Sequence, residues 1–178
     1  TQELRRHDRF AGYVYTEFAD VEHEAAGLLT TDRRAKDWGG CIPADVNADT
    51  VIVLDLVPLR AGADIEPSAS PLDLVAHVSH HGTDALRTQL HAAWLSAGAP
   101  VDGASASAAQ LRPDASSTEV EVAPFELSGE LRITVPAHEG TGRLLLWLTD
   151  PSGATVGRAF LDAAPVEEPN RRGARTAE

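Results

Sequence analysis

The 178-residue chain contains no methionine and a single cysteine, Cys41. A complete translation product normally begins with methionine or has recently lost one, so we expect a fragment or a processed chain. One cysteine can form neither a disulfide within the chain nor a cysteine-based zinc cluster. Cys41 follows Gly39-Gly40, which predicts a loop, and no histidine lies near it in sequence to activate it. We interpret Cys41 as a bystander thiol and expect no metal and no cofactor.

Long apolar runs are also missing. No stretch approaches the ~20 apolar residues that span a bilayer, and residues 1–7 have no apolar run that could form a secretory signal. With 15 basic and 27 acidic residues the net charge is −12, so phosphate groups and anionic membrane surfaces would be repelled. We predict a soluble protein, cytoplasmic or secreted, that has neutral ligands and binds neither nucleic acid nor membranes.

Aromatic residues make up only 5% of the chain, which leaves little material for an aromatic sugar-binding platform. We expect Trp94 and Trp147 in the core and Trp38 at the surface. Phosphate-binding glycine loops and the Gly-x-Ser-x-Gly motif are absent from the sequence. The histidines at 77, 80, 81 and 91 have no carboxylate at a metal-motif spacing, so we interpret them as hydrogen-bonded or solvated side chains.

One stretch, residues 12–22, concentrates what aromatic character there is. The β-branched and aromatic residues of 12–18 predict a strand. Alternation would place Tyr13, Tyr15 and Glu17 on one face and three mostly apolar side chains on the other, namely Val14, Thr16 and Phe18. The acidic residues Asp20, Glu22 and Glu24 follow at once. A half-polar strand that ends in carboxylates is typical of the mouth of a site.

The run GYVYTEFADVEHEAAGLLTTDRRAKDWG resembles the end of the catalytic barrel in glycoside hydrolase family 2, which contains β-galactosidases, β-glucuronidases and β-mannosidases. The matching landmarks are Gly12 to Thr16, Asp20 to Glu22, Gly27 to Leu29, and Asp32-Arg33 with Lys36. The resemblance implies the eighth strand of a (β/α)8 barrel and the loop after it. Active sites of such barrels lie at the C-terminal ends of the strands.

The resemblance therefore implies that Tyr15, Thr16 and Glu17 bind the sugar nearest the scissile bond. Better-known relatives have a tryptophan near this strand end, where this chain has Tyr15-Thr16-Glu17. The family's acid/base and nucleophilic glutamates come from the fourth and seventh strands, which would precede Thr1. We accordingly expect no catalytic residue in this chain.

The residues alone leave the roles of two sets of carboxylates open. Glu22 and Glu24 would have the spacing of a glycosidase pair if the strand continued through them, although we favour solvated carboxylates at the rim of the site. Glu17 suits an acceptor for a sugar hydroxyl, and its alternative is a buried carboxylate paired with an arginine of the barrel.

The pattern changes after a Gly- and Pro-containing boundary at residues 39–47. Short alternating segments separated by turn signals predict an immunoglobulin-like β-sandwich. Its expected strands cover 51–54, 72–79, 89–94, 104–111, 119–122, 131–135, 143–149 and 154–161. Asp150-Pro151-Ser152-Gly153 predicts the turn of the last hairpin. Ser79-His80-His81-Gly82 resembles a strand end in the sandwich that follows the family's barrel.

The predicted fold class is mainly β: a sandwich at 48–165 preceded at 1–47 by a barrel remnant and linker, with a disordered tail at 166–178. We expect the C-terminal part of a retaining β-glycosidase, inactive alone, whose parent has a β-linked sugar and the remainder of the barrel as partners. The alternatives are a non-catalytic carbohydrate-binding or adhesion sandwich and a purely structural interaction domain. Residues 1–45 must dock on the sandwich, pair with another chain or stay disordered, because one strand cannot satisfy its own backbone.

Overall fold

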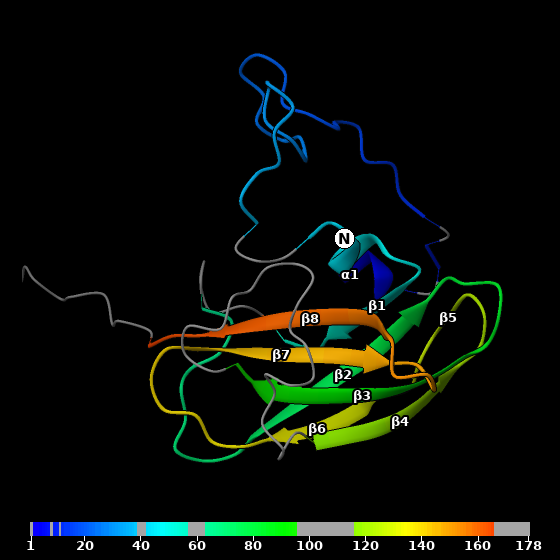
Figure 1. Cartoon of the computed structure of the whole chain (residues 1–178), viewed down its shortest axis with the longest axis vertical. Helices are drawn as coiled ribbons and strands as arrows, with labels where there is room; N and C mark the ends of the chain where they lie inside the picture. The colour runs from blue at the N-terminus through cyan, green and yellow to red at the C-terminus, as the bar shows by residue number, and fades with distance from the viewer. Residues whose placement is uncertain are drawn as a thin grey trace, which may run out of the picture.

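A computed structural model describes residues 2–7, 9–10, 12–38, 42–56, 63–95 and 116–165 (Figure 1). Two four-residue helices, α1 (Gln2–Arg5) and α2 (Ala44–Asn47), precede the strands. The strands are β1 (Thr50–Leu54), β2 (Leu72–His80), β3 (Leu86–Trp94), β4 (Ser116–Val122), β5 (Glu126–Leu127), β6 (Leu131–Val135), β7 (Gly142–Thr149) and β8 (Thr155–Ala163). The fold is therefore mainly β, as the sequence predicts. None of the helices in these described ranges is long and apolar enough to cross a membrane.

The strands form two antiparallel sheets that pack face to face (Figure 1). One sheet has the order β1-β2-β5, with β6 also paired to β2, and the other has the order β4-β3-β7-β8. Alternation explains the packing, since every second side chain of β2 and β3 is buried on the same face of its strand. The side chains that fill the space between the sheets include Ile52, Val78, Leu90, Trp94, Val135, Leu146 and Leu161.

The two buried tryptophans have different environments. Trp94 lies in the main core, donates from its indole nitrogen to the Pro136 carbonyl at 2.8 Å and stacks on His138. Trp147 is also buried, but it belongs to a second cluster with Ala93 and Leu145 on the opposite face of the β3–β7 pair. The core prediction is thus confirmed for Trp94, and Trp147 is buried outside the space between the sheets. Trp38 is exposed, as expected.

The β7–β8 turn forms as predicted. The Asp150 carboxylate accepts hydrogen bonds from the backbone N–H groups of Ser152 and Ala154 and from the Ser152 hydroxyl. These bonds lower the pKa of Asp150, the Ser152 hydroxyl contributing most. Gly153 has a φ of 86°, in the region where glycine carries no Cβ penalty.

The strand predicted at 12–18 does not form in the described chain. Residues 12–17 have no strand or bridge pairing, because no neighbouring strand is available among the described residues and a single strand cannot form a ladder. The expected strand at 104–111, the tail at 166–178 and the loop around Cys41 lie outside the described residues.

Both ends of the N-terminal region dock on the sandwich. Helices α1 and α2 contact β1. Val51 and Val53 of β1 are buried, and they lie opposite Ser79 and His77 of β2 in the sheet. Arg158 of β8 forms a two-point ion pair with Asp45 of α2 at 2.6 and 3.1 Å. Residues 1–45 were expected to dock on the sandwich, to pair with another chain or to stay disordered. The contacts show that residues 2–7 and 42–49 dock on the sandwich.

The guanidinium of Arg5 holds α1 in place. It is buried and donates to Ser79 Oγ at 3.0 Å, to the Ser79 carbonyl at 3.2 Å, and to the carbonyls of Ala48 and Asp49 at 3.0 and 2.8 Å. Burial lowers the pKa of Arg5, which the nearby Tyr13 and Asp49 partly offset. We refer to these four hydrogen bonds as the Arg5 clamp.

The Arg5 clamp should stabilise the sandwich measurably. Arg5→Ala leaves several buried acceptors without a donor, so we expect the free energy of unfolding to fall by about 3 kcal/mol in a urea titration. Arg9→Ala, at an exposed position of the same segment, is the matched control and should change it by no more than about 0.5 kcal/mol. Equal losses in the two variants would contradict the clamp.

Candidate functional site

The predicted site residues lie on a segment that projects from the sandwich. We call residues 12–38 the arm; Figure 1 shows it as a blue trace extending away from both sheets. Its first part, 12–17, makes no ladder, and its second part folds back on itself through bridges that pair Ala19 with Leu29, Val21 with Glu24, and Leu29 with Ala35. The arm is thus a local structure with few ties to the sandwich core.

The carboxylate of Asp20 organises the arm. It accepts the backbone N–H of Gly27 at 2.9 Å and an ammonium hydrogen of Lys36 at 2.7 Å. Lys36 also donates to the Ala25 carbonyl at 2.9 Å, and the Asp20 N–H donates to the Leu29 carbonyl at 2.9 Å. Asp20, Gly27, Leu29 and Lys36 are among the landmarks of the family resemblance, and in this chain their contacts close the arm.

Gly27 is required by the close approach of the chain to itself. A Cβ at this position would lie 2.3 Å from the backbone carbon of Ala19 and from the nitrogen of Asp20. The sequence signal for this closure was present in Asp20, Gly27 and the only lysine, Lys36, but its geometry could not be derived from spacing alone.

The three predicted sugar-binding residues have different environments. The Tyr15 hydroxyl donates to the Ala26 carbonyl at 2.7 Å, which ties the extended part of the arm to its folded part. Thr16 is exposed. Glu17 is half-buried, and its Oε2 is shielded from solvent without a hydrogen-bond donor. The arm thus brings Tyr15 and Glu17 to its folded part and leaves Thr16 at the surface.

The pKa of Glu17 is raised mainly by a side-chain hydrogen bond with the carboxyl group of Glu24, which favours the protonated form. Two carboxyls can bond only when one is protonated, because an ionised carboxylate has no donor. This contact is the main cause that raises the pKa of Glu17; partial burial and the charges of Glu24 and Asp20 add to it, and Lys36 opposes it. Glu17 therefore holds a proton more readily than an ordinary glutamate.

The Glu22–Glu24 pairing considered from the sequence required a continuing strand, which does not form. Val21 and Glu24 instead exchange backbone hydrogen bonds at 2.9 and 3.2 Å in a tight turn. Glu22 has a φ of 52° and is exposed. The continuing strand that a catalytic Glu22–Glu24 pair requires is therefore not present at these residues.

The arm also exposes most of the large apolar side chains found at the surface. Val14 is 86% exposed and Phe18 is 65% exposed. Other exposed large apolar residues between 10 and 38 are Phe10, Tyr13, Tyr15, Val21 and Trp38. These exposed apolar side chains thus gather on one segment of the described chain.

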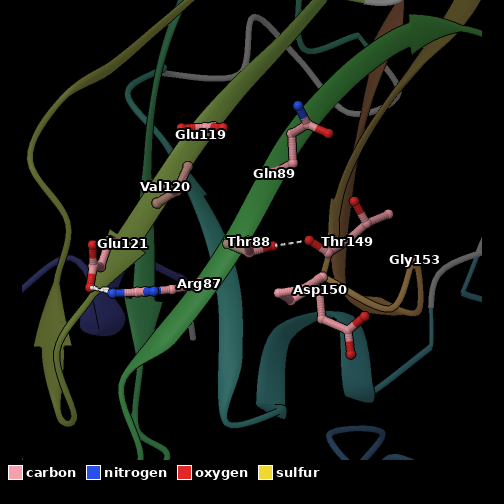
Figure 2. Close-up of a pocket in the computed structure, with 10 residues that line it drawn as sticks. Arg87, Thr88, Gln89, Glu119, Val120, Glu121, Thr149, Asp150 and Gly153 are labelled. Atoms are coloured by element: carbon pink, nitrogen blue, oxygen red, sulfur yellow. Dashed lines mark hydrogen bonds and ion pairs between the residues drawn. The ribbon is translucent and has the colours of Figure 1, made fainter.

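The sandwich itself carries a groove of about 790 Å³ over β3, between β4 and the β7–β8 turn (Figure 2). Arg87 forms an ion pair with Glu121 at 3.3 Å, and the Thr88 hydroxyl donates to the Thr149 carbonyl at 2.7 Å. The described residues that line it are Arg87, Thr88, Gln89, Glu119, Val120, Glu121, Thr149, Asp150, Pro151 and Gly153. None of them is aromatic, so this groove lacks the stacking surface of a sugar-binding sandwich.

Three of the four histidines singled out in the sequence, His77, His80 and His91, have side-chain partners in the protein. His80 Nδ1 lies 2.8 Å from Thr50 Oγ1, and its Nε2 lies 2.8 Å from the Asp84 carbonyl. His77 lies between Asp55 and the Ser128 carbonyl. His91 stacks on Trp147, and burial lowers its pKa. Across the described part of the chain, no three His, Cys, Asp or Glu side chains are grouped to hold a metal ion.

The motif Ser79-His80-His81-Gly82 forms the other half of the junction with α1. Ser79 accepts from Arg5, and the His81 N–H donates to the Asp49 carbonyl at 2.7 Å. Gly82 packs on His80, whose ring would lie 2.6 Å from a Cβ at 82. The motif therefore serves the junction between the N-terminal region and the sandwich.

Comparison with known proteins gives no family assignment. No protein-family model and no curated protein matches the chain. Among solved structures, it is similar to a CARDB domain from Pyrococcus furiosus in complex with di-metal ions, with 17% identity and a TM-score of 0.43 over 67% of this chain and 94% of that domain.

Two β-glucosidases are also similar to part of the chain. The Kluyveromyces marxianus enzyme in complex with glucose has 12% identity and a TM-score of 0.31, over 65% of this chain and 14% of the enzyme. The Bifidobacterium adolescentis GH3 enzyme has 14% identity and a TM-score of 0.31, over 67% of this chain and 18% of the enzyme. The chain thus spans less than a fifth of either enzyme, and likenesses this distant carry no conclusion about family or function.

Gly27→Ala should open the arm without unfolding the sandwich, because the new Cβ would overlap the Ala19–Asp20 backbone. We expect exchange of the Asp20 and Leu29 amide hydrogens to accelerate by about tenfold or more, while β3 and β7 stay protected. Gly12→Ala is the matched control, since a Cβ there meets nothing within 4 Å. Faster exchange in the core strands would show that the arm and sandwich unfold together.

Protonation of Glu17 should stabilise the folded part of the arm. A raised pKa in the folded state means that this stabilisation is complete below the ordinary value of 4.5 and is lost as pH rises through the raised value. Glu24→Gln supplies an amide donor at any pH, so carboxyl-carbon NMR should report a lower pKa for Glu17. Glu22→Gln is the control. If the pKa of Glu17 were the same in both variants, the influence of Glu24 on Glu17 would be refuted.

Proposed function

We propose that the chain is the C-terminal part of a retaining β-glycosidase of the family 2 type. Residues 1–47 would supply the last barrel strand with its loop, and 48–165 an immunoglobulin-like sandwich that supports it. The parent would hydrolyse β-glycosidic bonds by double displacement with two glutamates from other strands. This chain would contribute structure and one wall of the sugar pocket.

The observation that carries the proposal is the exposed apolar arm between two anchored ends, whose first part, 12–17, has no ladder. Arg5 fastens the chain before the arm and Asp45 fastens it afterwards, yet Val14 and Phe18 remain largely exposed. Aromatic and β-branched residues with unpaired backbone groups are stable when a sheet edge adds to them and a core covers them. A barrel whose last strand is residues 12–18 would supply both.

The shielded oxygen of Glu17 supports a sugar-facing role for Tyr15, Thr16 and Glu17. Its Oε2 lacks a donor in this chain, and a sugar hydroxyl could supply one. A buried acceptor that gains a hydrogen bond discriminates strongly for ligands that carry the donor. Tyr15 would support it by holding the extended part of the arm against Ala26.

The strand connectivity supports an immunoglobulin-like sandwich. β1, β2, β5 and β6 share one sheet, and β3, β7 and β8 lie side by side in the other with β4 at its edge. The chain crosses between sheets after β2, after β4 and after β6. Constant-type immunoglobulin domains distribute strands A, B, E and D against C, F and G in a similar way.

The proposal predicts that the 178-residue chain alone does not hydrolyse nitrophenyl β-glycosides, whereas the chain extended by the residues encoded before Thr1 does. In the extended protein, Glu17→Gln should raise KM by about tenfold because one sugar hydrogen bond is weakened. Glu22→Gln, an exposed carboxylate of the same arm, is the matched control and should leave KM unchanged. Hydrolysis by the isolated chain, or upstream sequence without barrel-spaced glutamates, would overturn the proposal.

A further inference from the structure

Strand β4 lies at an open edge of its sheet (Figure 1). Among the described strands it pairs only with β3, and its contacts with β6 are between the two sheets. In an antiparallel pair, residues alternate between those that exchange hydrogen bonds with the partner and those whose N–H and C=O groups point away from it. The far side of β4 therefore presents backbone donors and acceptors to which an extended chain can add.

The side chains of β4 alternate between the two faces of the sheet. Val120 and Val122 are buried in the core between the sheets. Glu119 and Glu121 are exposed on the outer face, where Figure 2 shows them beside the groove over β3. A chain that adds to β4 must match this period of two, with apolar residues beside the valines and polar or charged residues beside the glutamates.

The charges of the two glutamates are poorly compensated within the sheet. Glu121 lies opposite Arg87 of β3 and forms an ion pair with it at 3.3 Å, but the two side chains are 65% and 76% exposed. An exposed ion pair contributes little to stability, so it can exchange partners. Glu119 lies opposite the uncharged Gln89, so its carboxylate has no cation across the β3–β4 pair.

These charges select a basic partner over a second copy of the chain. In the antiparallel registers centred on Glu119 or Val120, the glutamates of two β4 strands would face each other directly, and like charges in such positions are destabilising. The net charge of −12 adds repulsion between copies. A strand with Lys or Arg at every second position would instead place a cation beside each glutamate.

We propose that β4 is a docking edge for a basic, extended segment of another protein, which adds to the sheet as a further strand. Its Lys or Arg side chains lie beside Glu119 and Glu121, and its β-branched residues lie beside Val120 and Val122. Main-chain hydrogen bonds give this contact its affinity, and the charge pattern gives it its selectivity. The proposal does not depend on a glycosidase origin, because all of its residues lie in the sandwich.

Binding of synthetic peptides tests the edge directly. The probe is a peptide with capped ends, as long as β4 (7 residues), in which Lys and Val alternate. One control peptide has Glu in place of Lys, and the other groups the same Lys and Val residues in two blocks. With the 178-residue chain, fluorescence anisotropy should give the alternating Lys peptide a Kd about tenfold lower than that of either control.

Hydrogen exchange locates the contact. The alternating Lys peptide should slow exchange at amides of β4 by about tenfold and leave β8, the other edge of the sheet, unchanged. Equal binding of the two Lys peptides would reveal charge attraction without strand addition. No binding would mean that the glutamates only protect the edge from pairing. Either result would overturn the proposal.

Exchange of the charges gives a second test. Glu119→Lys combined with Glu121→Lys should reverse the preference, so that the alternating Glu peptide binds about tenfold more tightly than the Lys peptide. Glu66→Lys combined with Glu139→Lys changes the net charge equally at exposed loop positions and should keep the preference for Lys. The same preference in both double variants would overturn the proposal. So would protection of β4 that grows with the concentration of the chain alone, which would indicate a second copy.

Discussion

The buried guanidinium of Arg5 is the interaction on which the arrangement of the N-terminal region depends. A cation removed from water is costly unless its donors are satisfied, and the hydrogen bonds of Arg5 go to Ser79 and to the carbonyls of Ala48 and Asp49. These acceptors lie on β2 and directly before β1. The four hydrogen bonds therefore join α1 to the paired β1 and β2 strands.

The arm and the sandwich that anchors it are stabilised by different interactions. The sandwich buries its apolar side chains between two sheets, whereas the arm is closed by polar contacts around Asp20 and leaves Val14 and Phe18 in solvent. Local polar closure gives a segment a defined shape with little hydrophobic stabilisation. Such a segment can keep its form while its apolar side chains stay exposed.

Features with a local or periodic cause could be predicted from the sequence. Strand alternation identified most of the sandwich, and Asp150-Pro151-Ser152-Gly153 identified the last turn, because both patterns act over a few residues. The predicted strand at 12–18 does not form, because a strand needs a neighbouring strand for its hydrogen bonds and the described chain provides none. The Arg5 clamp joins residues 74 positions apart, and the positive φ of Phe125 contradicts its residue type; neither has a local signal.

Three features of this chain are incomplete in different ways, and they point to the same region. Glu17 has an acceptor without a donor, residues 12–17 have a backbone without a ladder, and Phe125 has strain without compensating burial. Each would be a separate defect in a self-sufficient domain. All three lie on the arm or on the turn beside the junction that carries it, so these polar, backbone and apolar deficits occur in one region of the described chain.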